Sequence, residues 1–277
     1  MSDRVTCTIT NGVADVRLNR PDKMNAVDGA MFAALEATGE ALKTTPGVRA
    51  VVLSGEGRAF CAGLDFGSFQ AMAAGTLGGR SLDGAGAGPA RLSAGGLTNL
   101  GQHVAWVWHE LAVPVIAAVH GVALGGGFQI ALGADIRIVA PEAQMSVLEI
   151  RWGLIPDMTG THMLARLVPL DVAKELTWTG RTVSGPEAVQ IGLATKLSDD
   201  PRAEALELAA RLAAQSPHAI RAAKRLLNQS GLVTQAQQYL DESREMGALI
   251  GSPNQVEAVT AYFARRAPVY ADVDDDH

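Results

Sequence analysis

The sequence predicts an α/β protein whose C-terminal part is helical. Over residues 1–200, short apolar runs typical of strands alternate with helix-like segments, which indicates an α/β layer. From Pro201 onward only helical patterns follow, with no further strand apparent. We therefore expect an α/β core over residues 1–200 and a helical region over residues 201–277.

Local signals place the individual elements. Asn11-Gly12 suits a tight turn with positive φ. Asp28 can cap a helix, because its carboxylate can accept a backbone N–H of the first turn. In chain order we expect strands 5–9 and 13–18, a helix 28–43, strands 48–53 and 113–119, a helix 126–133 and a strand 135–139.

A long stretch rich in glycine and alanine, residues 67–96, interrupts these elements. It carries too few large apolar side chains to form core, so we expect a loop. Long loops are often either mobile surface connections or flaps over a site. Both interpretations stay open.

Two serine-proline pairs mark helix starts in the C-terminal region. Ser216-Pro217 and Ser252-Pro253 each combine an N-cap residue with proline at the first helical position. The helices that follow carry apolar faces, which we expect to dock on another surface, such as a second subunit.

Composition excludes several classes of function. The net charge of −6, without a basic patch, argues against nucleic acid binding. The two cysteines, Cys7 and Cys61, have no metal-like spacing, and no His-x-x-x-His motif occurs, so we expect no metal. A reducing compartment and an N-terminus without a signal-peptide pattern favour a cytoplasmic location.

One segment is long enough to span a bilayer. Residues 111–134 contain no Asp, Glu, Lys or Arg. The segment also contains Pro114, His120 and three consecutive glycines, which a strand, a turn and a helix explain better. We therefore expect no membrane insertion.

Two loops follow predicted strands, where α/β proteins place their sites. One is residues 58–65, and the other is residues 120–127, which end in Gly125-Gly126-Gly127. Consecutive glycines at a helix start can expose backbone N–H groups to an anion or oxyanion, or can simply allow close packing. A P-loop is excluded because Phe128-Gln129 follows the glycines, and the spacing does not fit G-x-G-x-x-G.

A third segment, residues 146–157, places Glu149 and Asp157 among apolar residues. Carboxylates in such surroundings tend to have raised pKa values and can exchange protons near neutral pH. The alternative is a structural ion pair of Glu149 with Arg151 or another base.

Together the three segments resemble the crotonase (enoyl-CoA hydratase/isomerase) superfamily, and the resemblance extends to the 263–270 tail. It implies a spiral core of ββα units and an acyl-CoA substrate. The family's Ala-Gly-x-Asp loop and Gly-Gly-Gly turn each give one N–H to the thioester oxygen, which corresponds here to Leu64 and Gly126. No cofactor beyond the CoA of the substrate is implied, and the expected assembly is a homo-oligomer, a trimer or a dimer of trimers.

The resemblance also implies a set of substrate-lining residues. Residues 19–26 resemble the family's CoA-lining stretch, and Lys23 is placed to meet the phosphates. The remaining residues expected near the substrate are Ala26, Ala62, Asp65 and Gln129, together with Phe263, Arg265 and Arg266 of the tail.

The type of reaction depends on three positions. In the hydratases of the family two glutamates add water; the first corresponds to Gln129 and the second to Glu149. Dienoyl-CoA isomerases have a proton-transferring aspartate at the position of Asp157, but they carry an acidic residue where this chain has Gln129, so the chain matches neither pattern fully. The catalytic residues are thus expected to be Glu149 and Asp157, with the N–H groups of Leu64 and Gly126, and isomerisation is slightly favoured over hydration. Hydration by Glu149 alone, thioester hydrolysis and acyl-CoA binding without turnover remain alternatives.

Overall fold

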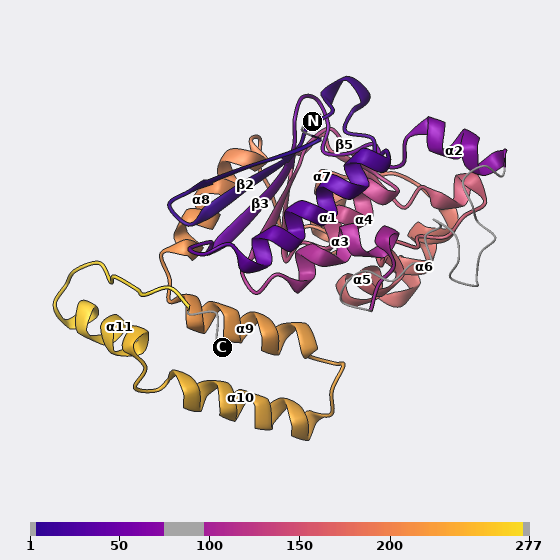
Figure 1. Ribbon diagram of the computed structural model, residues 1–277. Coiled ribbons are helices and arrows are strands. Elements are labelled where there is room, and N and C mark those ends of the chain that lie inside the picture. The colour runs from indigo at the N-terminus through magenta and orange to yellow at the C-terminus, as the bar shows by residue number, and fades with distance from the viewer. Residues whose placement is uncertain (1–3, 75–96, 274–277) are drawn as a thin grey trace.

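The computed structural model describes residues 4–74 and 97–273, and its centre is a six-stranded sheet (Figure 1). The strand order is β1-β2-β3-β4-β6-β9; β1 and β2 are antiparallel, and the other neighbours are parallel. The strands are β1 Val5–Thr10, β2 Val13–Leu18, β3 Ala50–Gly55, β4 Val115–Val119, β6 Ile136–Val139 and β9 Lys196–Leu197. A smaller sheet, in the order β5-β7-β8, consists of Val122–Leu124, Gln144–Ser146 and Val183–Ser184.

The predicted N-terminal hairpin is confirmed. Strands β1 and β2 pair from Val5↔Leu18 to Thr10↔Val13. Asn11 and Gly12 form the turn with φ values of 50° and 79°, the left-handed region that the Asn-Gly pair tolerates.

The predicted helix after Asp28 is also confirmed, with small shifts in neighbouring strands. Helix α1 (Gly29–Thr44) begins where the Asp28 carboxylate accepts the Met31 N–H over 2.8 Å. Strands β3 and β4 each begin two residues later than expected. For β4 the reason is Pro114, which has no N–H to donate to the sheet.

The expectation of a loop from residue 67 was wrong at its start. Helix α2 (Phe66–Ala73) occupies this part, and residues 75–96 lie outside the described chain. The helix is initiated by Asp65, whose carboxylate accepts the Gly67 N–H over 2.8 Å. The second half of the helix, Gln70 to Ala73, consists of good helix formers.

The large sheet has a helical layer on each face. Helices α1 and α3 (Leu100–Glu110) share a core with alternate strand residues, such as Val16 and Val51. The strand residues between these, such as Val52 and Ile116, pack against α8 (Pro201–Ala213) on the other face. This alternation is the period of two expected of a sheet that is covered on both faces.

The remaining elements before α8 are shorter. They are the 3-10 helices η1 (Pro21–Lys23) and η2 (Glu149–Trp152) and the helices α4 (Gly126–Leu132), α5 (Gly160–Leu167), α6 (Leu170–Thr179) and α7 (Gly185–Gln190). Of these, α4 and α7 pack on the small sheet.

The predicted helical C-terminal region is present. Helices α9 (Pro217–Gln229) and α11 (Pro253–Phe263) start at the two serine-proline pairs, and α10 (Gln235–Leu249) lies between them. Figure 1 shows α10 and α11 set apart from the sheet, and α10 has no buried residue. Helix α8 packs on the sheet, so the start of the helical region is attached to the core. The division near residue 200 remains a prediction. Within the described ranges, no helix combines the length and apolarity needed to cross a membrane.

Candidate active site

The two glycine-containing loops lie against each other. Phe60 donates its N–H to the His120 carbonyl over 2.9 Å, and Leu124 donates its N–H to the Cys61 carbonyl over 3.0 Å. Cys61 and Ala123 thereby form an isolated parallel bridge. The loop after β3 thus runs alongside β5, which continues into α4.

Two backbone N–H groups at this junction have no hydrogen-bond acceptor among the described residues. Val27 donates to the Gly63 carbonyl and accepts the Asp65 N–H, so the N–H and C=O of Leu64 itself point away from Val27. Gly126 is the first residue of α4, where an N–H has no partner within the helix. Within the described part of the chain, neither the Leu64 nor the Gly126 N–H has an acceptor.

The glycines are required both for packing and for backbone conformation. A Cβ on Gly63 would lie 2.4 Å from the Leu124 oxygen and 3.5 Å from the Gly126 nitrogen. Gly63 and Gly125 also have positive φ values of 86° and 51°. In the glycine run itself, a Cβ on Gly127 would lie 2.4 Å from the Cys61 carbonyl oxygen, so close packing is observed, and it brings together the segments that carry the Leu64 and Gly126 N–H groups.

Glu149 is the most buried carboxylate of this region. It opens η2, its side chain is 9% exposed, and its Oε2 atom is buried without a hydrogen-bond partner in the described structure. Burial raises the pKa of Glu149 above the usual carboxyl range, and the charge of nearby Asp157 raises it further. The alternative of an ion pair with Arg151 is not observed, since the side-chain partner of Glu149 is Gln129.

Asp157 lies in the turn that precedes α5. Loss of solvent around its carboxyl raises the pKa of Asp157. Its side chain is nevertheless exposed, so water screens this effect more than at Glu149. The structure therefore places two carboxyl groups with raised pKa values close enough to influence each other.

Gln129 lies between these two segments and is buried, with 1% exposure. Its Nε2 atom donates to Glu149 Oε1 over 2.5 Å. Its Oε1 atom accepts the N–H groups of Met158 and Gly160 over 2.8 and 3.0 Å. Gln129 thus bonds to both carboxylate-bearing segments, which sequence reasoning did not foresee.

Comparisons with known proteins show the family to which the chain belongs. A family model described as enoyl-CoA hydratase/isomerase matches residues 13–271. The chain is 31% identical over 257 residues to a short-chain-enoyl-CoA hydratase of Clostridium acetobutylicum, covering 92% of each protein. It is 31% identical over 280 residues to a 1,2-epoxyphenylacetyl-CoA isomerase of Escherichia coli K12, covering 98% of this chain and 99% of that protein. The chain belongs to the enoyl-CoA hydratase/isomerase family.

The crotonase-type fold is likewise confirmed. The crystal structure of an enoyl-CoA hydratase from Polaromonas sp. JS666 matches with a TM-score of 0.84 at 29% identity, over 96% of this chain and 99% of that chain. The protein is therefore an acyl-CoA enzyme of the crotonase superfamily.

The segment expected to line CoA in this crotonase adjoins the first loop. Lys23 is exposed, Ala26 is buried, and Ala62 donates its N–H to the Met24 carbonyl over 2.9 Å. Asp65 is bound by Arg20, with 2.7 Å between Nη1 and Oδ2. Asp65 therefore joins the two segments, and its contact with substrate remains a prediction.

The tail residues lie elsewhere. Figure 1 shows α11 on the opposite side of the molecule from α2. Phe263 is 79% exposed, Arg265 is exposed, and Arg266 forms a bidentate ion pair with Glu257. Within one chain, these three residues do not meet Glu149.

An aromatic pair beside the site was missed from the sequence. Phe66 of α2 and Trp152 of η2 meet edge to face, with ring centroids 6.0 Å apart. Phe66 follows Asp65 directly, and Trp152 is three residues after Glu149. The pair joins the first loop to the carboxylate segment with apolar surface, which suits an acyl chain.

Cys61, although part of the first loop, is unsuited to nucleophilic chemistry. Its thiol is fully buried, and burial raises the pKa of Cys61 to about 12. The thiol therefore stays protonated at neutral pH.

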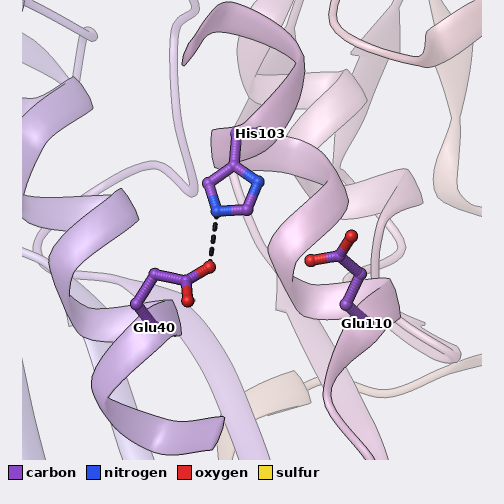
Figure 2. A group of neighbouring side chains, drawn as sticks. All are labelled: Glu40, His103 and Glu110. Atoms are coloured by element: carbon purple, nitrogen blue, oxygen red, sulfur yellow. Dashed lines mark hydrogen bonds and ion pairs between the residues drawn. The ribbon is translucent and has the colours of Figure 1, made fainter. Parts of the chain in front are cut away.

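One group of side chains has ligand atoms close enough for a metal ion. Figure 2 shows Glu40 of α1 facing His103 and Glu110 of α3; the ligand atoms of the group lie within 4.8 Å of one another. His103 Nε2 lies 2.6 Å from Glu40 Oε1, and Lys43 Nζ bonds to Glu40 and Glu110 over 2.7 and 2.8 Å. The Lys43 ammonium already supplies positive charge between the carboxylates, and the absence of a metal remains a prediction.

Proposed function

We propose that this enzyme shifts a double bond in an enoyl- or dienoyl-CoA thioester by proton transfer through an enolate. The observation that supports this most is the amide of Gln129 at the position of the first hydratase glutamate. A neutral amide cannot serve as the second carboxylate that activates water. Glu149 and Asp157 are then the two groups available for proton transfer.

The proposed mechanism uses the two unpaired N–H groups as an oxyanion hole. Leu64 and Gly126 donate to the thioester oxygen, and their donation strengthens as that oxygen becomes negative. Glu149 removes a proton from carbon, and the electron pair of the C–H bond moves through the conjugated system to the oxygen. Asp157 then delivers a proton to another carbon, the electron pair returns, and the double bond has moved.

The raised pKa of Glu149 suits this role. General acid–base catalysis is most efficient when the pKa of the group lies near the working pH. Burial raises the pKa of Glu149 in that direction, and Oε2 has no competing partner in the described structure. The relative named 1,2-epoxyphenylacetyl-CoA isomerase gives the family assignment a further isomerase precedent.

Hydration by Glu149 alone is the second candidate. Its support is that several relatives carry hydratase names, such as the short-chain-enoyl-CoA hydratase of Clostridium acetobutylicum. It requires water to be activated without a second carboxylate at residue 129.

We further propose that CoA binds beside Lys23, Ala26, Ala62 and Asp65, with no additional cofactor, and that the chain forms a trimer or a dimer of trimers. Large apolar side chains are exposed on the C-terminal helices: Tyr239, Leu240, Met246, Ile250, Val256, Val259, Tyr262 and Phe263. Exposed apolar side chains in this number favour a subunit interface. The tail could then reach the CoA of a neighbouring subunit.

The test is a screen of 2-enoyl, 3-enoyl and 3,5-dienoyl thioesters in which isomerisation, hydration and release of free CoA are followed separately. We expect isomerisation to be fastest. Faster hydration would favour the second candidate, and free CoA as the main product would indicate a hydrolase. Tight acyl-CoA binding without any turnover would contradict an enzymatic role.

A further inference from the structure

We infer that Gln129 is a positioning residue, which fixes one oxygen of Glu149 and leaves the other to exchange protons. This inference rests on the proposed function of Glu149 as the acid–base group. The expected contact of Gln129 with substrate remains a prediction, and the role inferred here does not depend on it. It acts through Glu149 and through the turn that follows Asp157.

The orientation of the Gln129 amide is determined by its surroundings. Its Oε1 atom accepts two backbone N–H groups, from Met158 and Gly160. An amide nitrogen at that place would face two donors and could accept from neither. Nε2 must therefore point the other way, toward Glu149 Oε1 at 2.5 Å.

This donor makes the two oxygens of Glu149 unequal. Oε1 is held by Gln129 and lies over Gly125, where an added Cβ would be 3.3 Å from it. Oε2 is buried and has no partner within the described ranges. A buried carboxylate oxygen without a partner is rare and points to a function or to an occupant that the site receives. We assign proton exchange to Oε2.

The same amide holds a strained turn. Thr159 has φ of 66°, which is unfavourable for a β-branched residue, and it lies between the two residues whose N–H groups Gln129 accepts. Gly160 must be glycine here, because a Cβ would lie 2.5 Å from Gln129 Oε1. Gln129 thus also determines where the chain leaves Asp157.

A carboxylate at residue 129 could accept the two N–H groups but could not donate to Glu149. Two carboxyl groups this close would not both be ionised near neutral pH but would share one proton, so they would titrate as a coupled pair. The glutamine keeps the turn intact and leaves Glu149 without a second carboxylate in hydrogen-bond contact, so that Asp157 is the acidic neighbour that influences its titration.

The experiment measures the titration of Glu149 by ¹³C NMR of glutamate side-chain carboxyls, in the wild type, Gln129→Met and Gln129→Glu. Glu149→Gln identifies the resonance, and exposed Gln215→Met is the matched control. Because the Nε2–H stabilises the ionised form, Gln129→Met should shift the Glu149 titration to higher pH. Gln129→Glu should produce a two-step titration, and Gln215→Met should change nothing.

Turnover gives the second readout. Gln129→Met should lower kcat by roughly tenfold to a hundredfold, the effect typical of a lost hydrogen bond to a charged group, with a smaller change in KM. The acidic limb of its pH–rate profile should move to higher pH, in parallel with the NMR titration. A single-step, unshifted Glu149 titration in folded Gln129→Glu would overturn the inference, even if Gln129→Met fails to fold. The titration needs no substrate, so a wild type without isomerase activity would refute the proposed function alone.

Discussion

Gly127 of α4 lies directly against Cys61 of the first loop, and a Cβ on Gly127 would be 2.4 Å from the Cys61 carbonyl oxygen. That carbonyl accepts the Leu124 N–H, so it cannot move without disturbing β5. The glycine run is therefore what allows the two loops to meet.

Gly127→Ala should separate the loops and lower turnover by at least about tenfold, since misplacement of a site by about 1 Å can reduce rates by up to a hundredfold. Gly29→Ala is the control, because a Cβ there has open space around it. Steady-state kinetics on the best thioester would check this. Equal activity of the two variants would mean that the loops tolerate a wider spacing.

Gly126→Pro removes the backbone N–H of residue 126, and proline is tolerated at the first position of a helix. Loss of one oxyanion donor typically lowers the rate by a hundredfold or more. Gly126→Ala keeps the N–H and introduces the same close contact with the flexible Met158 side chain. We expect a large loss of kcat only in Gly126→Pro. Similar losses in both variants would assign the effect to Met158 packing instead.

Several parts of this fold follow from local chemistry in the sequence. The Asn11-Gly12 turn, the Asp28 cap and the proline at residue 217 each act on adjacent residues, and each predicted element is present. Helix α3 was not predicted, although a local signal existed. Asn99 and Gln102 form a capping box, in which each side chain bonds to the backbone of the other residue.

The site could be predicted only in part. The resemblance directed attention to Glu149 and Asp157, which the structure brings near each other. The bonds of Gln129 join residues 20, 29 and 31 positions apart, and no spacing in the sequence indicates them. The contact of Phe66 with Trp152 is also purely tertiary.

Glu149→Gln should stabilise the folded protein at neutral pH. Because burial raises the pKa of Glu149, the folded state binds its proton more tightly than the unfolded state. Stability is therefore lost as pH rises from the ordinary carboxyl pKa through the raised one. Removal of this penalty should raise the unfolding midpoint by about 2–4 °C at pH 8, and by less near pH 4.

Thermal unfolding at both pH values tests this, with Glu207→Gln as an exposed control. Identical unfolding midpoints for Glu149→Gln and the wild type at pH 8 would show that the buried carboxylate does not destabilise the folded protein.

Phe263→Ser should weaken assembly or CoA binding without destabilising a single chain, because the side chain is 79% exposed. The comparison is Leu170→Ser, because Leu170 is 57% exposed but belongs to the α/β region rather than to the C-terminal helices. Sedimentation and CoA affinity are the measurements, and truncation before Tyr262 should exaggerate both effects. If the truncated chain keeps its oligomer size and its affinity, the tail is only a surface extension.

The central claim is that Glu149 and Asp157 move protons for isomerisation. The most direct test compares isomerisation and hydration rates in the wild type, Glu149→Gln and Asp157→Asn on the same thioesters. We expect isomerisation to dominate in the wild type and to fall about a hundredfold or more in each variant. Vigorous wild-type hydration that survives Asp157→Asn would contradict the claim and leave Glu149 as the sole essential carboxylate.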